Sequence, residues 1–255
     1  MNSFKKSIAT VALLATSIAA QAEVIKIDAT AFKPQAGLIT FSEKPLNSTN
    51  PTYNPSDYGG VLGAPVVTFG GYFTGQTLGT FATCPAGAAL TGCVIGSPSG
   101  TLSLDVNSPA TFITGDGSNP TSPVLSGRPT FNGPIAIFFD VDVAAVGLEG
   151  GFFNGIGGTA ITAFARDGSL LGSVSNEMTG IEFLGLAAQP GKKIAGLLFS
   201  LVGNEPAGFG IDNLRFGASE QIVLPPPIDV PEPASIALFG FALAGLAAFR
   251  RNRKV

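Results

Sequence analysis

The 255-residue chain contains no histidine and no tryptophan, and it has only two cysteines. Without histidine it cannot form a Ser-His-Asp or Cys-His catalytic group, a histidine-ligated zinc site or a histidine pH switch. Its glycine clusters match no phosphate-cradling loop followed by a helix. The enzymatic route that remains is a pair of carboxylates of the kind that hydrolyses glycosides.

The carboxylates of the sequence give that route little support. Asp140 and Asp142 lie on the same side of a predicted strand and alternate with apolar residues, which is typical of a solvated face. Glu149, Glu177 and Glu182 have no sequence context that marks them as catalytic. We therefore expect no catalytic residues and a protein that is not an enzyme, with a glycoside-active enzyme as the less favoured alternative.

The end of the chain combines a proline motif, an apolar run and a basic end. Pro231, Glu232 and Pro233 precede a largely apolar run of 16 residues at 234–249, which is followed by four basic residues. As a helix this run is about 24 Å long, which is short for a bilayer core of about 30 Å. The basic end favours the cytoplasmic side of the membrane. The tail is predicted to be a transient membrane anchor, and a permanent C-terminal anchor is the alternative.

Val230-Pro-Glu-Pro233, the short Gly/Ala-rich apolar run and the Arg-rich end resemble the PEP-CTERM sorting signal of Gram-negative bacteria. In that family an exosortase, a membrane cysteine transpeptidase, recognises the Pro-Glu-Pro and processes the protein. The resemblance covers about a tenth of the chain. It assigns Pro231, Glu232 and Pro233 as the sorting motif, and it implies a link to exopolysaccharide and biofilm systems.

The start of the chain is typical of a signal peptide. Lys5 and Lys6 are followed by a short apolar stretch at 8–20 and by the small-residue pattern Ala20-Gln-Ala22. This pattern predicts cleavage by signal peptidase between Ala22 and Glu23. An N-terminal transmembrane anchor is the alternative. Between the predicted cleavage point and the tail, the chain has 8 basic and 16 acidic side chains, so its net charge is about −8. That charge argues against nucleic acid as a partner and is compatible with divalent cations.

Cys84 and Cys93 are nine positions apart in a Gly/Ala-rich segment. In an exported chain, two close cysteines predict a disulfide. A redox or metal-binding pair is the alternative, but the spacing is not Cys-x-x-Cys and no histidine is present to complete a metal site.

Alternating apolar residues and abundant Gly and Pro predict an all-β antiparallel sandwich at 23–219. The signal peptide at 1–22 precedes it, and a Pro-rich stalk at 220–230 and the sorting tail at 231–255 follow it. The expected strands occupy residues 25–31, 102–106, 135–143, 161–166, 169–174, 194–202 and 209–216. Asp167-Gly168 is predicted to be the two-residue turn of a hairpin, and the nearly all-apolar segment 194–202 is predicted to be a central strand covered on both faces. Surface loops are expected at 47–63, 97–99 and 115–128.

The segments Ile39-Thr-Phe-Ser-Glu43 and Gly210-Ile-Asp-Asn213 resemble the opening and closing strands of exported bacterial jelly rolls, including carbohydrate-binding modules. This resemblance implies that the sandwich is jelly-roll-like. In such modules, acids on these two strands can share a structural calcium, which here would be held by Glu43 and Asp212. Alternatively, Asp212 stabilises a turn through hydrogen bonds to nearby amides. Tyr53 and Tyr58 are candidates for sugar contacts, and anchoring of their loop is the alternative that we favour.

Together these features predict an exported structural component of the cell surface or extracellular matrix. The expected partners are signal peptidase, an exosortase, the membrane during transient anchoring, and exopolysaccharide. A calcium-dependent carbohydrate-binding module is the alternative function.

Overall fold

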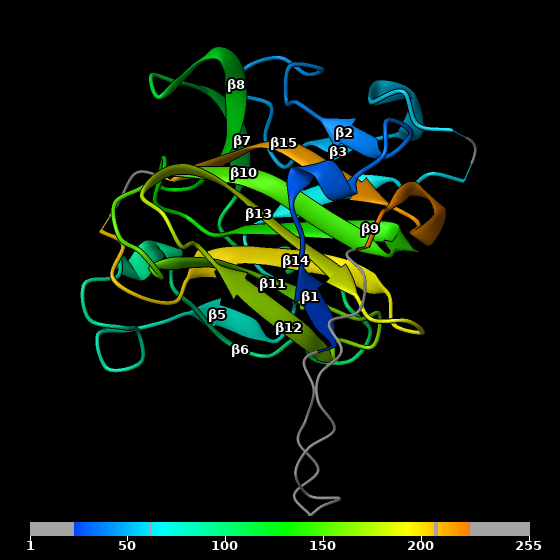
Figure 1. Cartoon of the computed structure of the whole chain (residues 1–255). Helices are drawn as coiled ribbons and strands as arrows, with labels where there is room; N and C mark the ends of the chain where they lie inside the picture. Colours follow the sequence, from blue (N-terminus) through cyan, green and yellow to red (C-terminus); the bar gives the residue numbers. More distant parts are fainter. Residues whose placement is uncertain (1–22, 62, 207–208, 225–255) are drawn as a thin grey trace, which may run out of the picture. The chain divides into compact units, whose positions relative to one another are not determined.

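The computed structural model describes residues 23–61, 63–206 and 209–224, apart from the side chains of Pro120 and Thr121. Within these residues the fold is all-β, and every strand pair is antiparallel. Two sheets form a sandwich, as the sequence predicted (Figure 1). Each sheet has alternating apolar residues that need cover on one face, and two such faces cover each other.

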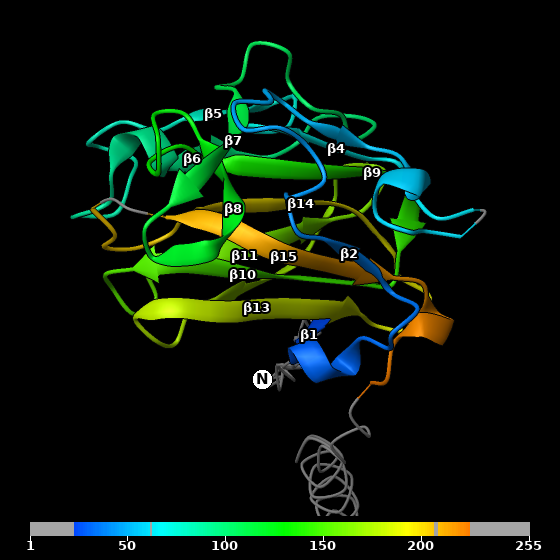
Figure 2. The same cartoon turned by 90° about the horizontal axis from the view of Figure 1, so that it is seen from above.

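The first sheet has seven strands, and β13, β10 and β15 lie side by side in its centre (Figure 2). Its strands, in spatial order, are β1 (Val24–Lys26), β13 (Gly180–Ala188), β10 (Ala145–Phe153), β15 (Gly210–Gly217), β8 (Asn119–Gly127) and β7 (Thr111–Asp116), with β2 (Gly37–Ile39) also paired to β15.

The second sheet has six strands, and a separate two-stranded ribbon contains β5 (Gln76–Leu78) and β6 (Val94–Gly96). The six strands, in spatial order, are β12 (Leu170–Ser175), β11 (Thr159–Phe164), β14 (Ile194–Leu201), β9 (Ile135–Val143), β4 (Val67–Gly70) and β3 (Thr52–Tyr53). The chain crosses between the sheets from β9 to β10 and again from β10 to β11, as expected for a jelly-roll-like sandwich.

The core lies between the two sheets and has a smaller counterpart on the outer face of each. Leu197 and Phe199 of β14 belong to the central core, whereas Ala195 and Leu198 of the same strand pack in the outer cluster. Strand β14 is therefore buried on both faces, which explains its continuous apolar sequence and confirms the central strand predicted there.

The structure also confirms the strands predicted at 135–143 and 209–216, and the hairpin around Asp167-Gly168. The turn of that hairpin is longer than the two residues expected, because β11 ends at Phe164 and β12 begins at Leu170. Gly168 adopts a φ of +83°, a conformation that glycine tolerates without strain.

Three predictions of secondary structure were wrong. The segment at 115–128 is not a loop: it belongs to strands β7 and β8, which form a hairpin despite two prolines. The segment at 102–106 is not a strand, because it crosses the outer face of the second sheet and inserts Leu102 and Leu104 there. Of the strand predicted at 25–31, only Ile25 and Lys26 lie in a strand (β1, Val24–Lys26), since Ala29–Ala31 form a 3₁₀ turn.

The loop predicted at 47–63 contains β3 and the 3₁₀ turn Pro55–Asp57, so it is more ordered than expected. At the end of the sandwich, the turn η4 (Ser219–Gln221) is followed by Ile222, whose buried side chain packs with Phe32 against Ala145. The predicted signal peptide, most of the predicted stalk, and the sorting tail with its predicted helix lie outside the described residues. Within the described residues, no helix is long and apolar enough to cross a membrane.

Candidate functional site

Asp212 on β15 is at the centre of a buried polar network. Its side chain is 3% exposed, and its strand register places it opposite Glu149 of β10. One oxygen of Asp212 accepts a hydrogen bond from the Asn213 backbone N–H at 2.7 Å, and the other accepts one from the Asn119 amide at 2.7 Å. The Asn213 amide donates to Glu149 at 2.9 Å and so links the two acids.

Burial raises the pKa of Asp212 above its ordinary value, and the charge of Glu149 acts in the same direction. The hydrogen bonds from Asn213, Asn119 and Ser122 oppose this shift because they stabilise the carboxylate. Burial thus disfavours the charged form of Asp212, and the neighbouring hydrogen-bond donors stabilise that form.

Glu43 lies in the neighbouring turn and has different partners. Its carboxylate accepts hydrogen bonds from the backbone N–H and the hydroxyl of Thr40, both at 2.9 Å. Ser122 lies between the two acids, since its hydroxyl has one proton that it can donate either to the Thr40 carbonyl at 3.1 Å or to Asp212. Glu43 and Asp212 are therefore at the two ends of one network and share no direct hydrogen bond.

This network fits a calcium ion poorly in the conformation described. Calcium takes six to eight oxygen ligands, whereas both oxygens of Asp212 already accept hydrogen bonds. The hollow beside Asp212 has a volume of about 10 Å³, close to the lower limit for one water molecule. Within residues 23–61, 63–206 and 209–224, no three acidic, cysteine or histidine side chains form a metal-binding group. Calcium shared by Glu43 and Asp212 stays a prediction.

Tyr53 and Tyr58 have unequal positions. Tyr53 is fully buried, and its ring packs edge-to-face against Phe41 and Phe69 in the core. This corrects the hypothesis of a sugar contact at Tyr53, because the ring is inaccessible; it anchors its loop instead.

Tyr58 lines a cleft of about 450 Å³ between segment 34–38, loop 58–65 and the end of β9. Its hydroxyl donates to the Pro65 carbonyl at 2.5 Å, and its ring contacts Phe216. Burial raises the pKa of Tyr58 to about 12, and the charge of Asp140 adds to this shift. A sugar contact at Tyr58 stays a prediction.

Each carboxylate considered for glycoside chemistry has a structural partner. Asp140 accepts a hydrogen bond from the Val66 N–H at 2.6 Å, and Asp142 pairs with Arg166. Glu177 pairs with Lys26 at 2.8 Å, and Glu182 accepts hydrogen bonds from the N–H groups of Glu177 and Met178.

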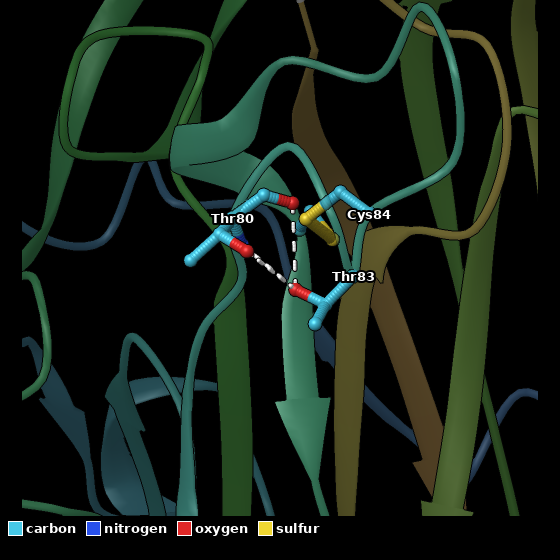
Figure 3. Close-up of a disulfide and its surroundings, with 4 residues drawn as sticks. Thr80, Thr83 and Cys84 are labelled. Carbon is cyan, nitrogen blue, oxygen red and sulfur yellow. Dashed lines mark hydrogen bonds between the residues drawn. A yellow bond between two sulfur atoms is a disulfide. The ribbon is translucent and has the colours of Figure 1, made fainter.

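The predicted disulfide between Cys84 and Cys93 is present, with a Cα–Cα distance of 6.1 Å. Figure 3 shows the turn that leads into it, in which the Thr83 hydroxyl lies against Thr80. The Cys84 N–H donates to the Thr80 carbonyl at 2.9 Å. The Gly79 Cα lies so close to the disulfide that a side chain there would collide with the sulfur of Cys84.

Two features were missed at the sequence level. Glu205 is completely buried and accepts three hydrogen bonds from Asn154 and Gly155, although it lies in a Pro/Gly-rich loop that marks it as exposed. Phe81 is almost fully exposed, although phenylalanine normally indicates a core position. In neither case does the sequence pattern give a signal.

Comparison with known proteins identifies the sorting motif in the C-terminal tail. A family model described as a PEP-CTERM protein-sorting motif matches residues 229–254. The chain carries a PEP-CTERM sorting motif. It is therefore an exported protein whose processing partner is an exosortase. The PEP-CTERM match includes Pro231, Glu232 and Pro233, and it lies outside the residues that the structure describes.

The PEP-CTERM match does not include the sandwich. No curated protein matches the chain. Among solved structures, the enzymatically active domain of tailspike protein 4 of bacteriophage CBA120 is 14% identical, with a TM-score of 0.25. That match covers 69% of this chain and 19% of the tailspike chain, so this chain spans about a fifth of its length. Likeness at this TM-score carries no argument about fold or activity.

Proposed function

We propose that this exported protein is a structural component of the cell surface or extracellular matrix, delivered by an exosortase system that serves an exopolysaccharide-rich layer or biofilm. The observation that carries the proposal is the presence, in one chain, of a PEP-CTERM motif and a two-sheet sandwich. Transient anchoring by the apolar run at 234–249 would hold the chain at the membrane until the exosortase acts.

The proposal includes a sandwich without catalytic activity. Its support is the engagement of Asp140, Asp142, Glu182 and Glu205 in hydrogen bonds or ion pairs that fix loops and strands. A carboxylate that holds backbone N–H groups in place is poorly suited to transfer a proton or attack a sugar. A glycoside hydrolase screen of the exported protein, with no turnover expected, tests this part.

The test of sorting compares hosts with and without the exosortase. Surface-extracted protein should begin at Glu23 and lack residues 234–255 when the exosortase is present. A Glu232→Ala variant should stay longer in the membrane fraction with its tail attached. Intact mass and cell fractionation measure both results. A surface protein that keeps its tail in the exosortase-positive host would contradict the proposal.

A second candidate is a calcium-dependent carbohydrate-binding module. The observation that favours it is the cleft beside Tyr58, whose volume of about 450 Å³ is in the range of small-ligand sites. Binding of oligosaccharides that depends on calcium and is lost in Tyr58→Ala would support this candidate over a purely structural role.

A further inference from the structure

Phe81 has a position that the packing of the sandwich does not explain. Its side chain is 92% exposed, whereas the transfer of a phenyl ring out of water is favourable. Its neighbours along the chain hold its backbone in place. The Thr80 N–H donates to the Thr83 hydroxyl at 2.8 Å, and the Gly79 N–H donates to the Cys93 carbonyl at 2.9 Å.

The disulfide ends the turn that presents this ring, because Cys84 follows Phe81 by three residues. Phe81 lies just before the loop that the disulfide closes, and hydrogen bonds between Thr80 and both Thr83 and Cys84 hold its backbone, so the ring loses little backbone freedom when a ligand arrives. Such preorganisation lowers the entropic cost of binding. The exposed ring is therefore a prepared contact surface.

A groove of about 370 Å³ lies beside the ring. It is lined by Phe81, the disulfide loop from Cys84 to Leu90, and Pro206. None of these lining residues has an ionisable side chain, since Cys84 is bonded to Cys93. Ala86 and Gly87 present mainly backbone atoms, and the exposed side chain of Asn204 lies against Gly87. The groove thus combines an aromatic ring, small apolar groups and uncharged polar groups.

The rest of the sandwich holds the groove open. The Ala89 N–H donates to the backbone carbonyl of Glu205 at 3.0 Å, and the buried Glu205 carboxylate is fixed by Asn154 and Gly155. The teal loops that contain the groove lie at the opposite end of the long strands from η4, shown in orange in Figure 2. The end of the described chain, beyond η4, leaves the groove clear.

These properties select a class of ligand. The volume suits a small ligand, whereas a protein partner usually needs about 800 Å² on each side. An anionic ligand finds no basic group in the groove and meets an exported part with a net charge of about −8. A sugar ring without charge offers an apolar face for Phe81 and hydroxyls for Asn204 and the loop backbone.

We propose that the groove beside Phe81 binds one or two units of a neutral saccharide, whose apolar ring face stacks on Phe81. The proposal deepens the surface role by naming a ligand class. It rests on that role only for the place where the protein meets the ligand, which is the cell surface or matrix. The site is separate from the Tyr58 cleft, since the two share no lining residue.

The chain has no tryptophan, so Phe81→Trp places a single indole reporter in the groove. Its emission should change saturably with neutral gluco-, manno- or galacto-oligosaccharides and stay unchanged with an oligouronate. The matched control is Val106→Trp, because Val106 is 95% exposed and lies outside the groove. In calorimetry, Phe81→Ala should bind the responding oligosaccharide about tenfold more weakly, whereas Val106→Ala should bind it like the wild type.

Three results would overturn the proposal: no neutral oligosaccharide changes the emission of Phe81→Trp, the two reporter variants respond equally, or Phe81→Ala keeps full affinity. An emission change with protein concentration alone, accompanied by dimers in sedimentation, would assign the groove to a second copy and also overturn it. None of these results affects the exosortase-dependent processing that tests the surface role. Unchanged melting temperatures of the Phe81 variants show that the fold is intact.

Discussion

The carboxylate of the fully buried Glu205 accepts a hydrogen bond at 2.8 Å from the backbone N–H of Asn154, a residue 51 positions earlier in the chain. It also accepts one from the Gly155 N–H at 3.0 Å. One side chain thereby fixes the loop after β10 against the loop after β14, and both loops lie at the end of the sandwich that contains the Phe81 groove.

Glu205→Ala should lower the free energy of unfolding by about 3 kcal/mol, because it leaves buried N–H groups without an acceptor. For a domain of this size, the melting temperature should fall by about 6–12 °C. The control is Asp28→Ala: Asp28 is exposed and makes no capping hydrogen bond, so its loss should change stability by less than about 0.5 kcal/mol. Equal melting temperatures for the two variants would show that the Glu205 contacts do not hold the loops.

Cys84→Ser together with Cys93→Ser should destabilise the sandwich by about 2.6 kcal/mol, the chain-entropy value for so short a loop. Thermal unfolding of the double variant measures this change. Mass spectrometry of an unreduced digest of the wild type should give one linked peptide that contains both cysteines. Two alkylatable thiols in natively exported protein would contradict the pairing.

Asp212 should make stability depend on pH in a defined direction. Because burial raises its pKa in the folded state, its stabilising contribution is complete below the unfolded value of about 3.8 and is lost as the pH rises through the folded value. The Asp212→Asn variant has no carboxyl group to ionise at this position, so it does not lose this stability as the pH rises. The melting temperature of Asp212→Asn minus that of the wild type should therefore increase between about pH 3 and pH 7. A difference that stays constant or decreases would show that the carboxylate is not disfavoured by burial.

The calcium hypothesis is tested in the same proteins at neutral pH. A calcium ion at a hundredfold excess over its Kd adds about 2.7 kcal/mol to the stability of the folded state. Wild type should then melt about 5–11 °C higher in calcium than in chelator, whereas Asp212→Asn should not respond. Glu43→Gln and Glu149→Gln decide which acid shares the ion. Identical melting temperatures of the wild type in both buffers would show that the protein does not bind calcium at this site.

Tyr58 gives a prediction at alkaline pH. Burial raises its pKa to about 12, so its contribution to stability is present below the ordinary value of 10 and is lost as the pH rises toward 12. Tyr58→Phe removes both this ionisation and the hydrogen bond to Pro65, with a cost of about 1 kcal/mol at neutral pH. The wild type should lose its advantage over Tyr58→Phe between pH 10 and 12 in thermal melts. If the difference in melting temperature between the two proteins stays constant across that range, the Tyr58 hydroxyl does not have a pKa raised by burial.

The sequence predicted the long strands well because their side chains alternate or are uniformly apolar. Strand β9 at Ile135–Val143 and strand β14 at Ile194–Leu201 are examples. It failed for β7 and β8, where prolines and glycines suggested a loop. Strand β8 meets β15 at a single register pair, Ile211 with Leu125, so the ladder leaves room for residues that a central strand excludes.

The candidate sites were predicted less completely than the fold. The sorting motif and the disulfide depend on local spacing, which a single sequence displays. The partnership of Asp212 with Glu149 depends on the register of β10 and β15, which is shifted by an irregularity between Gly147 and Glu149. The burial of Tyr53 and the exposure of Phe81 depend on how loops fold over the sandwich, and the composition of these loops contains no such information.

The pairing of the earliest strands has a consequence for export. Val24 of β1 is the register partner of Ala188, and Gly37 of β2 is the partner of Phe216. A chain that crosses a membrane from its N-terminus delivers these two strands long before their partners arrive, so the seven-stranded sheet cannot close during most of the passage. The polypeptide thus stays unfolded, and able to pass through a translocation channel, until nearly all of the sandwich has crossed the membrane. Closure then covers the outer edge of β13 at residues 186–188, which would otherwise be open to pairing with another chain during secretion.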